Sequence, residues 1–127
     1  MAYANITKPS LKMNTVLYTG DGSTQGVSGV GFQPDLVWIK DRGETHSHRL
    51  FDAVRGTTKY LASNNSDAEG TDANSLTTFG VDGFTVGTSN EVNKNTNTYA
   101  SWNFKANGAG SLNQDGSIDS TVSTDSD

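Results

Sequence analysis

The densest apolar stretch of the chain, residues 31–40, limits the fold more than any other feature. A glycine–proline turn leads into four consecutive large apolar residues at 36–39, and charged residues follow at 40–42. A short run that is rich in β-branched and aromatic residues and bounded by turn signals is typical of a strand buried on both faces. Because Pro34 stands ahead of the run, it leaves the hydrogen-bond ladder intact. We therefore expect residues 35–40 to form the central strand of an all-β domain.

The composition favours the same fold class. Only 32% of the 127 residues are apolar, and they gather in short runs separated by Gly, Ser, Thr, Asn and Asp. Short strands joined by polar loops have such a pattern, and helical bundles do not. With about seven short strands in one domain, we predict two packed antiparallel sheets, a β-sandwich with jelly-roll-like connectivity.

The chain divides into three parts. Residues 1–13 are polar and aperiodic, and we expect an extended arm that frays or docks on a neighbour. Residues 14–123 hold the apolar runs and form the predicted sandwich. Residues 124–127 consist of Thr, Asp and Ser, for which we expect a flexible end. A natural end and a cut inside a longer protein both stay open as explanations of this run.

The Asp-Gly pair at 82–83 predicts a hairpin. It stands between alternating apolar residues, which is a signal for a two-residue type I′ turn. Such a turn pairs Val81 with Phe84, and Phe79 with Val86. All four apolar side chains then point to one face of the hairpin, and this consistency supports the register.

A second clear alternation covers residues 98–105. Every second position is small or apolar, namely Ala100, Trp102, Phe104 and Ala106. We expect this side to face the core, with Asn103 and Lys105 in water. Trp38 of the central strand is likewise assigned to the core, so its replacement by alanine is expected to unfold the domain at a cost of about 3–5 kcal/mol. Stacking of both tryptophans on sugars, as in lectin sites, is the alternative.

The remaining strands and loops follow from the same patterns. We expect strands at 15–19, at 24–30 on a sheet edge, at 59–62 and at 118–122. We expect polar or charged loops at 41–48, 64–74 and 87–97.

Composition disfavours several classes of function. The chain has no cysteine, which excludes a disulfide framework, a thiolate zinc site and a cysteine nucleophile. A formal net charge of −5 argues against a nucleic-acid binder, which needs a basic patch. Residues 1–12 lack the apolar region of a secretory signal. No apolar stretch is long enough to cross a bilayer, so we expect no membrane insertion.

Two loops carry side chains that bind ions in other proteins. His46 and His48 lie close to Asp41 and Glu44, and a His-x-His pair can bind zinc. Because a third ligand at a suitable spacing is not evident, we interpret this segment as a solvated loop, with the zinc site as the alternative. The acidic loop 64–72 offers oxygen ligands for calcium, but its spacing does not fit an EF-hand. A solvated loop is again the favoured interpretation.

Basic residues gather in a narrow window: Lys40, Arg42, Arg49, Arg55 and Lys59. Acidic residues are interspersed there, so a salt-bridged surface is favoured over a patch for an anionic polymer.

No catalytic pattern accompanies these groups. Asp52 with a histidine would be half of a triad, but no Gly-x-Ser-x-Gly motif occurs. Paired carboxylates for glycoside hydrolysis stay an open alternative. We predict a protein that is not an enzyme and that has no catalytic, cofactor-binding or metal-binding residues.

Most of the chain, from residue 15 to residue 122, resembles an uncharacterised β-rich domain of tailed-phage virion proteins that is common in marine phages. The motifs that carry the resemblance are GFQPDLVWIK (31–40), LFDAVRG (50–56), KYLASN (59–64), LTTF (76–79), DGFTVG (82–87), YASWNFKA (99–106) and NQDGSI (113–118). In longer members of this family a second, similar β unit follows the point where this chain ends. An N-terminal fragment and a short stand-alone version are therefore both open.

The resemblance implies a structural role and transfers no site residue. We expect a non-enzymatic component of the virion, in a tail fibre, a tail appendage, a head fibre or a head decoration. It would self-associate, with a trimer favoured, and dock on other virion proteins. The alternative is a carbohydrate-binding module that recognises host-surface glycan through the loops at 64–74 and 87–97, with or without calcium.

Overall fold

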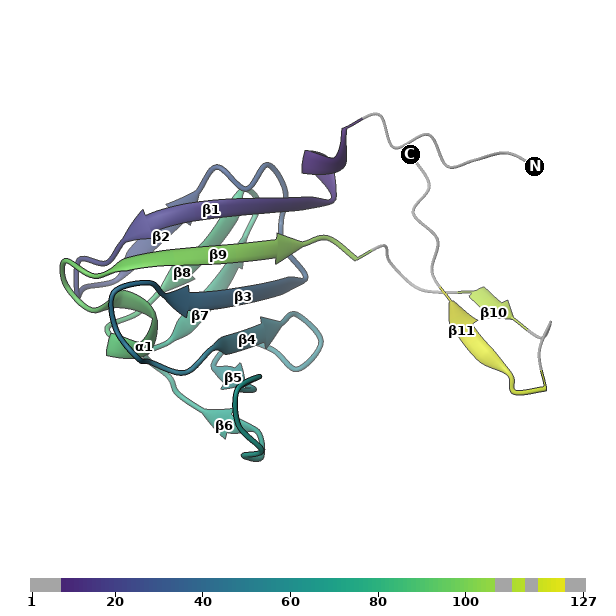
Figure 1. The fold of residues 1–127 in the computed structure, drawn as a ribbon. Helices are drawn as coiled ribbons and strands as arrows, with labels where there is room; N and C mark the ends of the chain where they lie inside the picture. Colours follow the sequence, from purple (N-terminus) through teal and green to yellow (C-terminus); the bar gives the residue numbers. More distant parts are fainter. Residues whose placement is uncertain (1–7, 107–110, 114–116, 123–127) are drawn as a thin grey trace.

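The computed structural model describes residues 8–106, 111–113 and 117–122, and the regular secondary structure of these residues is almost only antiparallel β-structure. The two main sheets lie face to face, which confirms the predicted all-β sandwich (Figure 1). The jelly-roll connectivity stays a prediction. Within the described residues, no helix has the length and apolarity that crossing a membrane requires.

The larger sheet has four strands in the order β1-β9-β3-β4 and lies in front in Figure 1. Its strands are β1 (Met13–Thr19), β9 (Thr98–Phe104), β3 (Leu36–Asp41) and β4 (Arg49–Asp52). As predicted, the tryptophan-containing strand β3 is an inner strand, since it pairs with β9 on one side and β4 on the other. The backbone ahead of it is also bonded, because the Asp35 N–H donates to the Phe104 carbonyl at 2.9 Å.

The smaller sheet lies behind the larger one and has the order β2-β8-β7. Its strands are β2 (Gln25–Ser28), β8 (Gly83–Val86) and β7 (Leu76–Gly80). Strand β2 is an edge strand, as the sequence predicts for this region.

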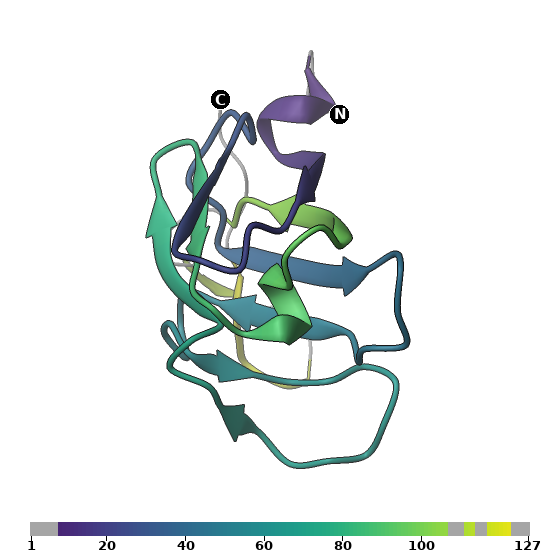
Figure 2. The same ribbon diagram turned by 90° about the vertical axis from the view of Figure 1, so that its left-hand side faces the viewer.

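The hydrophobic core fills the space between the two sheets. Its buried members are Val27, Val37, Ile39, Phe51, Leu76, Phe84, Val86, Val92 and Tyr99. Val92 belongs to the short helix α1 (Asn90–Asn93), which lies across one end of the sandwich in Figure 2 and interrupts the loop expected at 87–97. Contributions from both sheets and from α1 make this one continuous core.

Two small strand pairs stand outside the main sheets. β5 (Lys59–Tyr60) pairs with β6 (Gly70–Thr71), and a bridge between Leu50 and Leu61 joins this pair to β4. β10 (Ser111–Asn113) pairs with β11 (Ser120–Val122), and Figure 1 shows this hairpin beside the sandwich. The strand expected at 118–122 is thus confirmed in β11, whereas β6 lies inside a segment that we predicted to be a loop.

The predicted arm at residues 1–13 is shorter than expected where the structure describes it. A 3-10 helix, η1 (Pro9–Leu11), precedes β1, and β1 already begins at Met13. Residues 1–7 and 124–127 lie outside the described residues.

The predicted register of the β7–β8 hairpin is wrong. Phe79 pairs with Phe84 and Gly80 with Gly83, so that Val81 and Asp82 form the turn. Val81 is 88% exposed and joins no apolar face.

Contacts with the segment around β2 explain this register. The two carboxylate oxygens of Asp82 accept hydrogen bonds from the N–H groups of Gly29 and Gly31, at 3.0 and 2.6 Å. Gly83 lies so close to β2 that a Cβ there would overlap the carbonyl oxygen of Val27. Glycine is therefore needed at this position for strand packing, and its positive φ of 153° favours glycine as well.

The prediction that β3 is buried on both faces is also wrong. Val37, Ile39 and Asp41 are buried, whereas the alternate residues Leu36, Trp38 and Lys40 are only half-buried. One side of the larger sheet therefore faces the core, and the other, which we call the outer face, is turned away from it.

Strand β9 is oriented opposite to the prediction. Tyr99, Ser101 and Asn103 are completely buried on the inner side, whereas Trp102 and Phe104 lie half-buried on the outer face. The inner polar side chains are hydrogen-bonded to β1: the Asn103 amide donates to the Asn14 carbonyl at 3.1 Å and the Ser101 hydroxyl to the Val16 carbonyl at 3.2 Å. These bonds satisfy polar groups that would otherwise be costly to bury.

Candidate functional site

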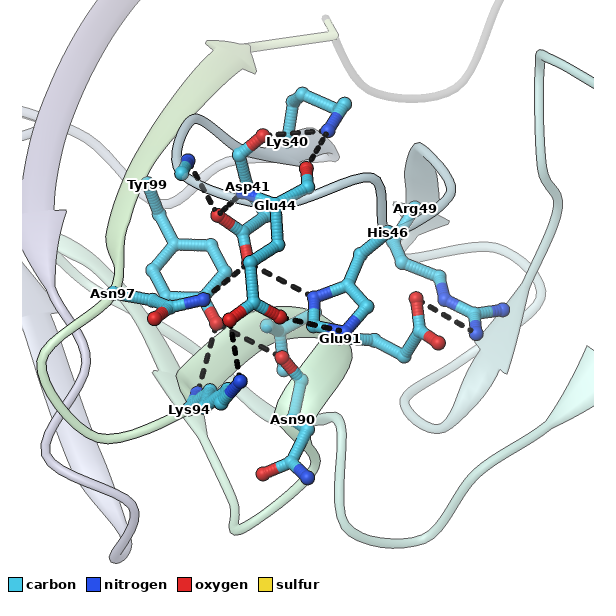
Figure 3. Close-up of polar contacts among 12 residues, drawn as sticks. Lys40, Asp41, Glu44, His46, Arg49, Asn90, Glu91, Lys94, Asn97 and Tyr99 are labelled. Carbon is cyan, nitrogen blue, oxygen red and sulfur yellow. Dashed lines mark hydrogen bonds and ion pairs between the residues drawn. The ribbon is translucent and has the colours of Figure 1, made fainter.

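The loop between β3 and β4, which the sequence marks as charged, is organised by the buried carboxylate of Asp41 (Figure 3). One oxygen accepts hydrogen bonds from the backbone N–H groups of Gly43 and Glu44, at 2.8 and 3.1 Å. The other oxygen contacts Nδ1 of His46 at 2.9 Å and accepts from the side-chain amide of Asn97 at 2.8 Å. This carboxylate ties the loop to the segment that precedes β9.

The hydrogen bonds of Asp41 outweigh its burial. Burial by itself raises the pKa of this carboxyl, but the donors from Asn97, Gly43, His46 and Glu44 favour the charged form, so the pKa lies below the usual 3.8. Asp41 is therefore an anion at neutral pH.

Asp41, Glu44 and His46 form the group of side chains that comes nearest to a metal site. Their ligand atoms lie within 4.8 Å of one another. Each is already engaged: the Asp41 oxygens accept the four contacts above, Glu44 forms an ion pair with Lys94, and His46 lies 3.6 Å from Glu44. Lys94 also counters the negative charge that would attract a cation. The arrangement is suited to holding the loop.

The two histidines of the proposed zinc pair diverge. His48 turns to the outer face, where its Nδ1 accepts a hydrogen bond from the indole N–H of Trp38 at 2.8 Å. Its backbone N–H donates to the Asn64 side chain at 3.0 Å. The structure does not bring His46 and His48 together at one centre.

Two tyrosines fix helix α1 beside this loop. The Tyr99 hydroxyl donates to the Asn90 carbonyl at 2.9 Å and accepts from the Lys94 N–H at 2.8 Å, and the Tyr18 hydroxyl donates to the Val92 carbonyl at 2.6 Å. Burial raises the pKa of Tyr99 to about 12, and that of Tyr18 well above its usual value. Both phenols are neutral and act as structural donors.

Asn93 is a buried polar residue that the sequence analysis misses. Its side-chain amide donates to Asp21, to the Ser23 carbonyl and, at 2.8 Å, to the Gly87 carbonyl, while its oxygen accepts from the Asp21 N–H at 3.0 Å. A single asparagine within a polar segment carries no sequence signal for this role, because two of its three partner residues, Asp21 and Ser23, lie 72 and 70 residues away.

The basic window is salt-bridged, as expected. Arg55 binds Asp52 at 2.5 Å and Glu69 at 3.2 Å, Lys59 approaches Glu69 at 3.8 Å, and Arg49 approaches Glu91 at 3.4 Å. Asp52 therefore pairs with an arginine and not with a histidine. These pairs engage Arg49, Arg55 and Lys59. Lys40 instead donates to backbone carbonyls, and Arg42 is exposed. A polyanion would therefore find only part of the positive charge of the window available.

One carboxylate of the acidic loop, that of Asp72, is turned toward the neighbouring loop. Asp72 accepts hydrogen bonds from the Ser89 hydroxyl at 2.6 Å and from the Asn74 N–H at 2.9 Å. The Ser89 N–H in turn donates to the Asn74 carbonyl at 2.9 Å. The loops at 64–74 and 87–97 thus lie side by side, but these contacts bind them to each other.

A polar cavity of about 130 Å³ lies beside the same loop. Its lining includes Ser47, Arg49, Tyr60, Asn65 and Asp67. Arg49 covers the ring of Tyr60 at 3.7 Å, so this aromatic face is not open to a sugar. The volume suits a few water molecules and lies below the range of about 300–1,000 Å³ typical of ligand pockets.

The outer face of the larger sheet is the most unusual surface of the molecule. In a sandwich this side is normally polar. Here each of the four strands contributes large apolar side chains to it, among polar ones such as Thr15, Lys40 and Asp52. Strand register and exposure place on it Met13, Leu17, Leu36, Trp38, Leu50, Leu61, Trp102 and Phe104. Leu17 is 61% exposed and Met13 39%. This face looks toward the viewer in Figure 1.

Two tryptophans form the centre of the outer face. Trp38 and Trp102 are directly opposite each other in the register of β3 and β9, with ring centroids 5.6 Å apart and planes tilted by 56°. His48 packs against Trp38 with a centroid distance of 5.5 Å. The assignment of both tryptophans to the core is wrong, and the physical reason is that Val37 and Ile39 occupy the inner side of β3 instead.

The model of the domain of unknown function DUF7483 matches residues 8–127, which include every strand described above. No curated protein matches the chain, and no solved structure matches it.

Proposed function

The chain belongs to the DUF7483 family of domains of unknown function, and we propose that it is a non-enzymatic structural component of a bacteriophage particle. Its place would be a tail fibre, a tail appendage, a head fibre or a head decoration. In that setting the domain self-associates, with a trimer favoured, and docks on other virion proteins. The placement in the virion rests on the resemblance of its motifs to tailed-phage proteins.

The observation that carries the assembly role is the apolar outer face. A β-sandwich needs one apolar side per sheet for its core, and here the larger sheet has two. Exposed contiguous apolar surface of this kind marks interaction sites, because covering it gains about 25 cal/mol for each Å² removed from water. The polar clusters around Asp41 and around Arg55 support the same conclusion, since their charged groups are paired with one another rather than arranged around a substrate.

Sedimentation of the purified chain tests this proposal. We expect an oligomer that dissociates when Leu17→Lys places a charge on the outer face. Val81→Lys is the matched control, since Val81 is an apolar residue in the β7–β8 turn that is even more exposed than Leu17. A folded monomer that binds no virion protein would contradict the proposal, as would equal dissociation by both variants.

A glycan-binding module is the second candidate, and the half-exposed tryptophan pair is the observation that favours it. Indole rings on a solvent-facing sheet can stack on sugar rings. A glycan array probed with and without chelator, using the wild type and Trp102→Ala, separates the two functions. Signal that disappears in Trp102→Ala supports glycan binding, and a blank array with the wild type rejects it.

A further inference from the structure

The β10–β11 hairpin is the second uncovered apolar element of the chain. Leu112 of β10 is 63% exposed, and Ile118, between the two strands, is 81% exposed. Each strand has only three residues, and an isolated two-stranded hairpin of this size is marginally stable in water. The hairpin therefore needs a surface to pack against.

We infer that the β10–β11 hairpin of one copy docks on the outer face of a second copy of this chain. This inference rests on the proposed function and names the contact by which the domain self-associates. Both surfaces are apolar, both are exposed within one chain, and together they would bury Leu112 and Ile118 against residues such as Leu17 and Met13.

Charge complements the apolar contact. Residues 107–127 contain four aspartates, Asp115, Asp119, Asp125 and Asp127, and no lysine or arginine. The outer side of the larger sheet carries Lys40 next to Trp38 along the alternation of β3, and the exposed Arg42 continues it. An acidic segment that lies on this sheet is attracted to these cations and is steered in register.

The structure favours a second copy over the same chain as the partner. The hairpin follows β9 directly in the sequence, yet Leu112 and Leu17 both stay more than half exposed. The hairpin of this chain thus leaves its own outer face uncovered. A contact between a hairpin and a different surface is heterologous. Repeated copies then form a closed ring, such as a trimer, when the rotation between copies closes, and an open filament when it does not.

Cross-linking of single-cysteine variants of the full chain tests this contact. Because the chain has no native cysteine, each variant carries one reactive thiol at a known position. Leu17→Cys and Leu112→Cys, one of them ¹⁵N-labelled, are mixed and treated with a short bis-maleimide, and mass spectrometry identifies the mixed product. Val81→Cys replaces Leu17→Cys as the control. We expect at least about tenfold more mixed product with Leu17→Cys, because docking raises the effective concentration of the two thiols. Met13→Cys gives a second position on the outer face.

The other outcomes overturn the inference in distinct ways. A dominant Leu17→Cys homodimer would show that two outer faces pack together. In the double variant Leu17→Cys/Leu112→Cys, an intramolecular link that persists on dilution would show that the hairpin covers its own chain. Yields equal to the Val81→Cys control at both positions would reject any such docking. If sedimentation shows an oligomer while these links are absent, the inference fails and the proposed function stands. A folded monomer that binds no virion protein would reject both.

Discussion

The inner and outer faces of the larger sheet have reversed polarity along β9. The inner face buries Ser101 and Asn103 completely, while the outer face leaves Trp102 and Phe104 partly in water. The inner polar groups are tolerated because β1 offers carbonyl acceptors to them, although Oδ1 of Asn103 has no hydrogen-bond partner among the described residues. The polar side of a strand can therefore be buried where its groups find hydrogen-bond partners, and the apolar side of the same strand then lies outside the core.

The largest expected difference in unfolding free energy is between the alanine variants of two phenylalanines that lie on opposite faces of the larger sheet. Phe51→Ala should lower the free energy of unfolding by about 3–5 kcal/mol, because Phe51 is completely buried between the sheets. Phe104→Ala should cost far less, since its ring is only half-buried on the outer face. Urea unfolding of both variants measures this, and equal costs would break the distinction between the faces.

Substitution of Asp41 tests how much a buried polar residue of the inner face contributes to stability. Asp41→Asn should cost about 2–3 kcal/mol at pH 7, because the lost charge weakens several hydrogen bonds to a buried group. The folded pKa of Asp41 is lowered, so its contribution is present above the unfolded pKa of about 3.9 and is lost as the pH falls through the folded pKa.

The pH dependence provides the check on Asp41. The difference in unfolding free energy between the wild type and Asp41→Asn should be constant from pH 7 to pH 5 and should shrink below pH 4. A difference that stays unchanged in acid would show that the charge of Asp41 does not hold the loop.

Trp38 should now behave as a residue of the outer face. Trp38→Ala is expected to cost about 1–2 kcal/mol and to leave the domain folded, which is less than the value for a fully buried tryptophan. Far-UV circular dichroism and urea unfolding measure this, and sedimentation should show weakened association. Complete unfolding of the variant would show that Trp38 is needed for the fold, as a core residue is.

Leu17→Lys should have the smallest effect on stability. Its side chain is largely exposed, so the free energy of unfolding should change by no more than about 0.5 kcal/mol. Thermal unfolding of a diluted sample, in which the chain is dissociated, gives this value. A large destabilisation under those conditions would mean that Leu17 supports the fold of its own chain.

The candidate surface was only partly predictable. The sequence analysis selected Trp38 and Trp102 and weighed them as exposed stacking residues, yet it assigned them to the core because apolar side chains are usually inside. It also grouped His46 with His48 by spacing, whereas the fold directs His46 to Asp41 and His48 to Trp38. The roles of Asn93 and Asn97 depend on partners far along the chain and leave no local pattern.

The all-β class, the inner position of the strand at 35–40 and the alternation of β9 follow from the sequence alone. Period-2 alternation assigns residues to two sides of a strand but is symmetric between them. Which side is inside depends on tertiary contacts, because β1 supplies the acceptors for Asn103 and the smaller sheet packs against Val37 and Ile39. The same tertiary contacts place both tryptophans on the outer face, on which the proposed function depends.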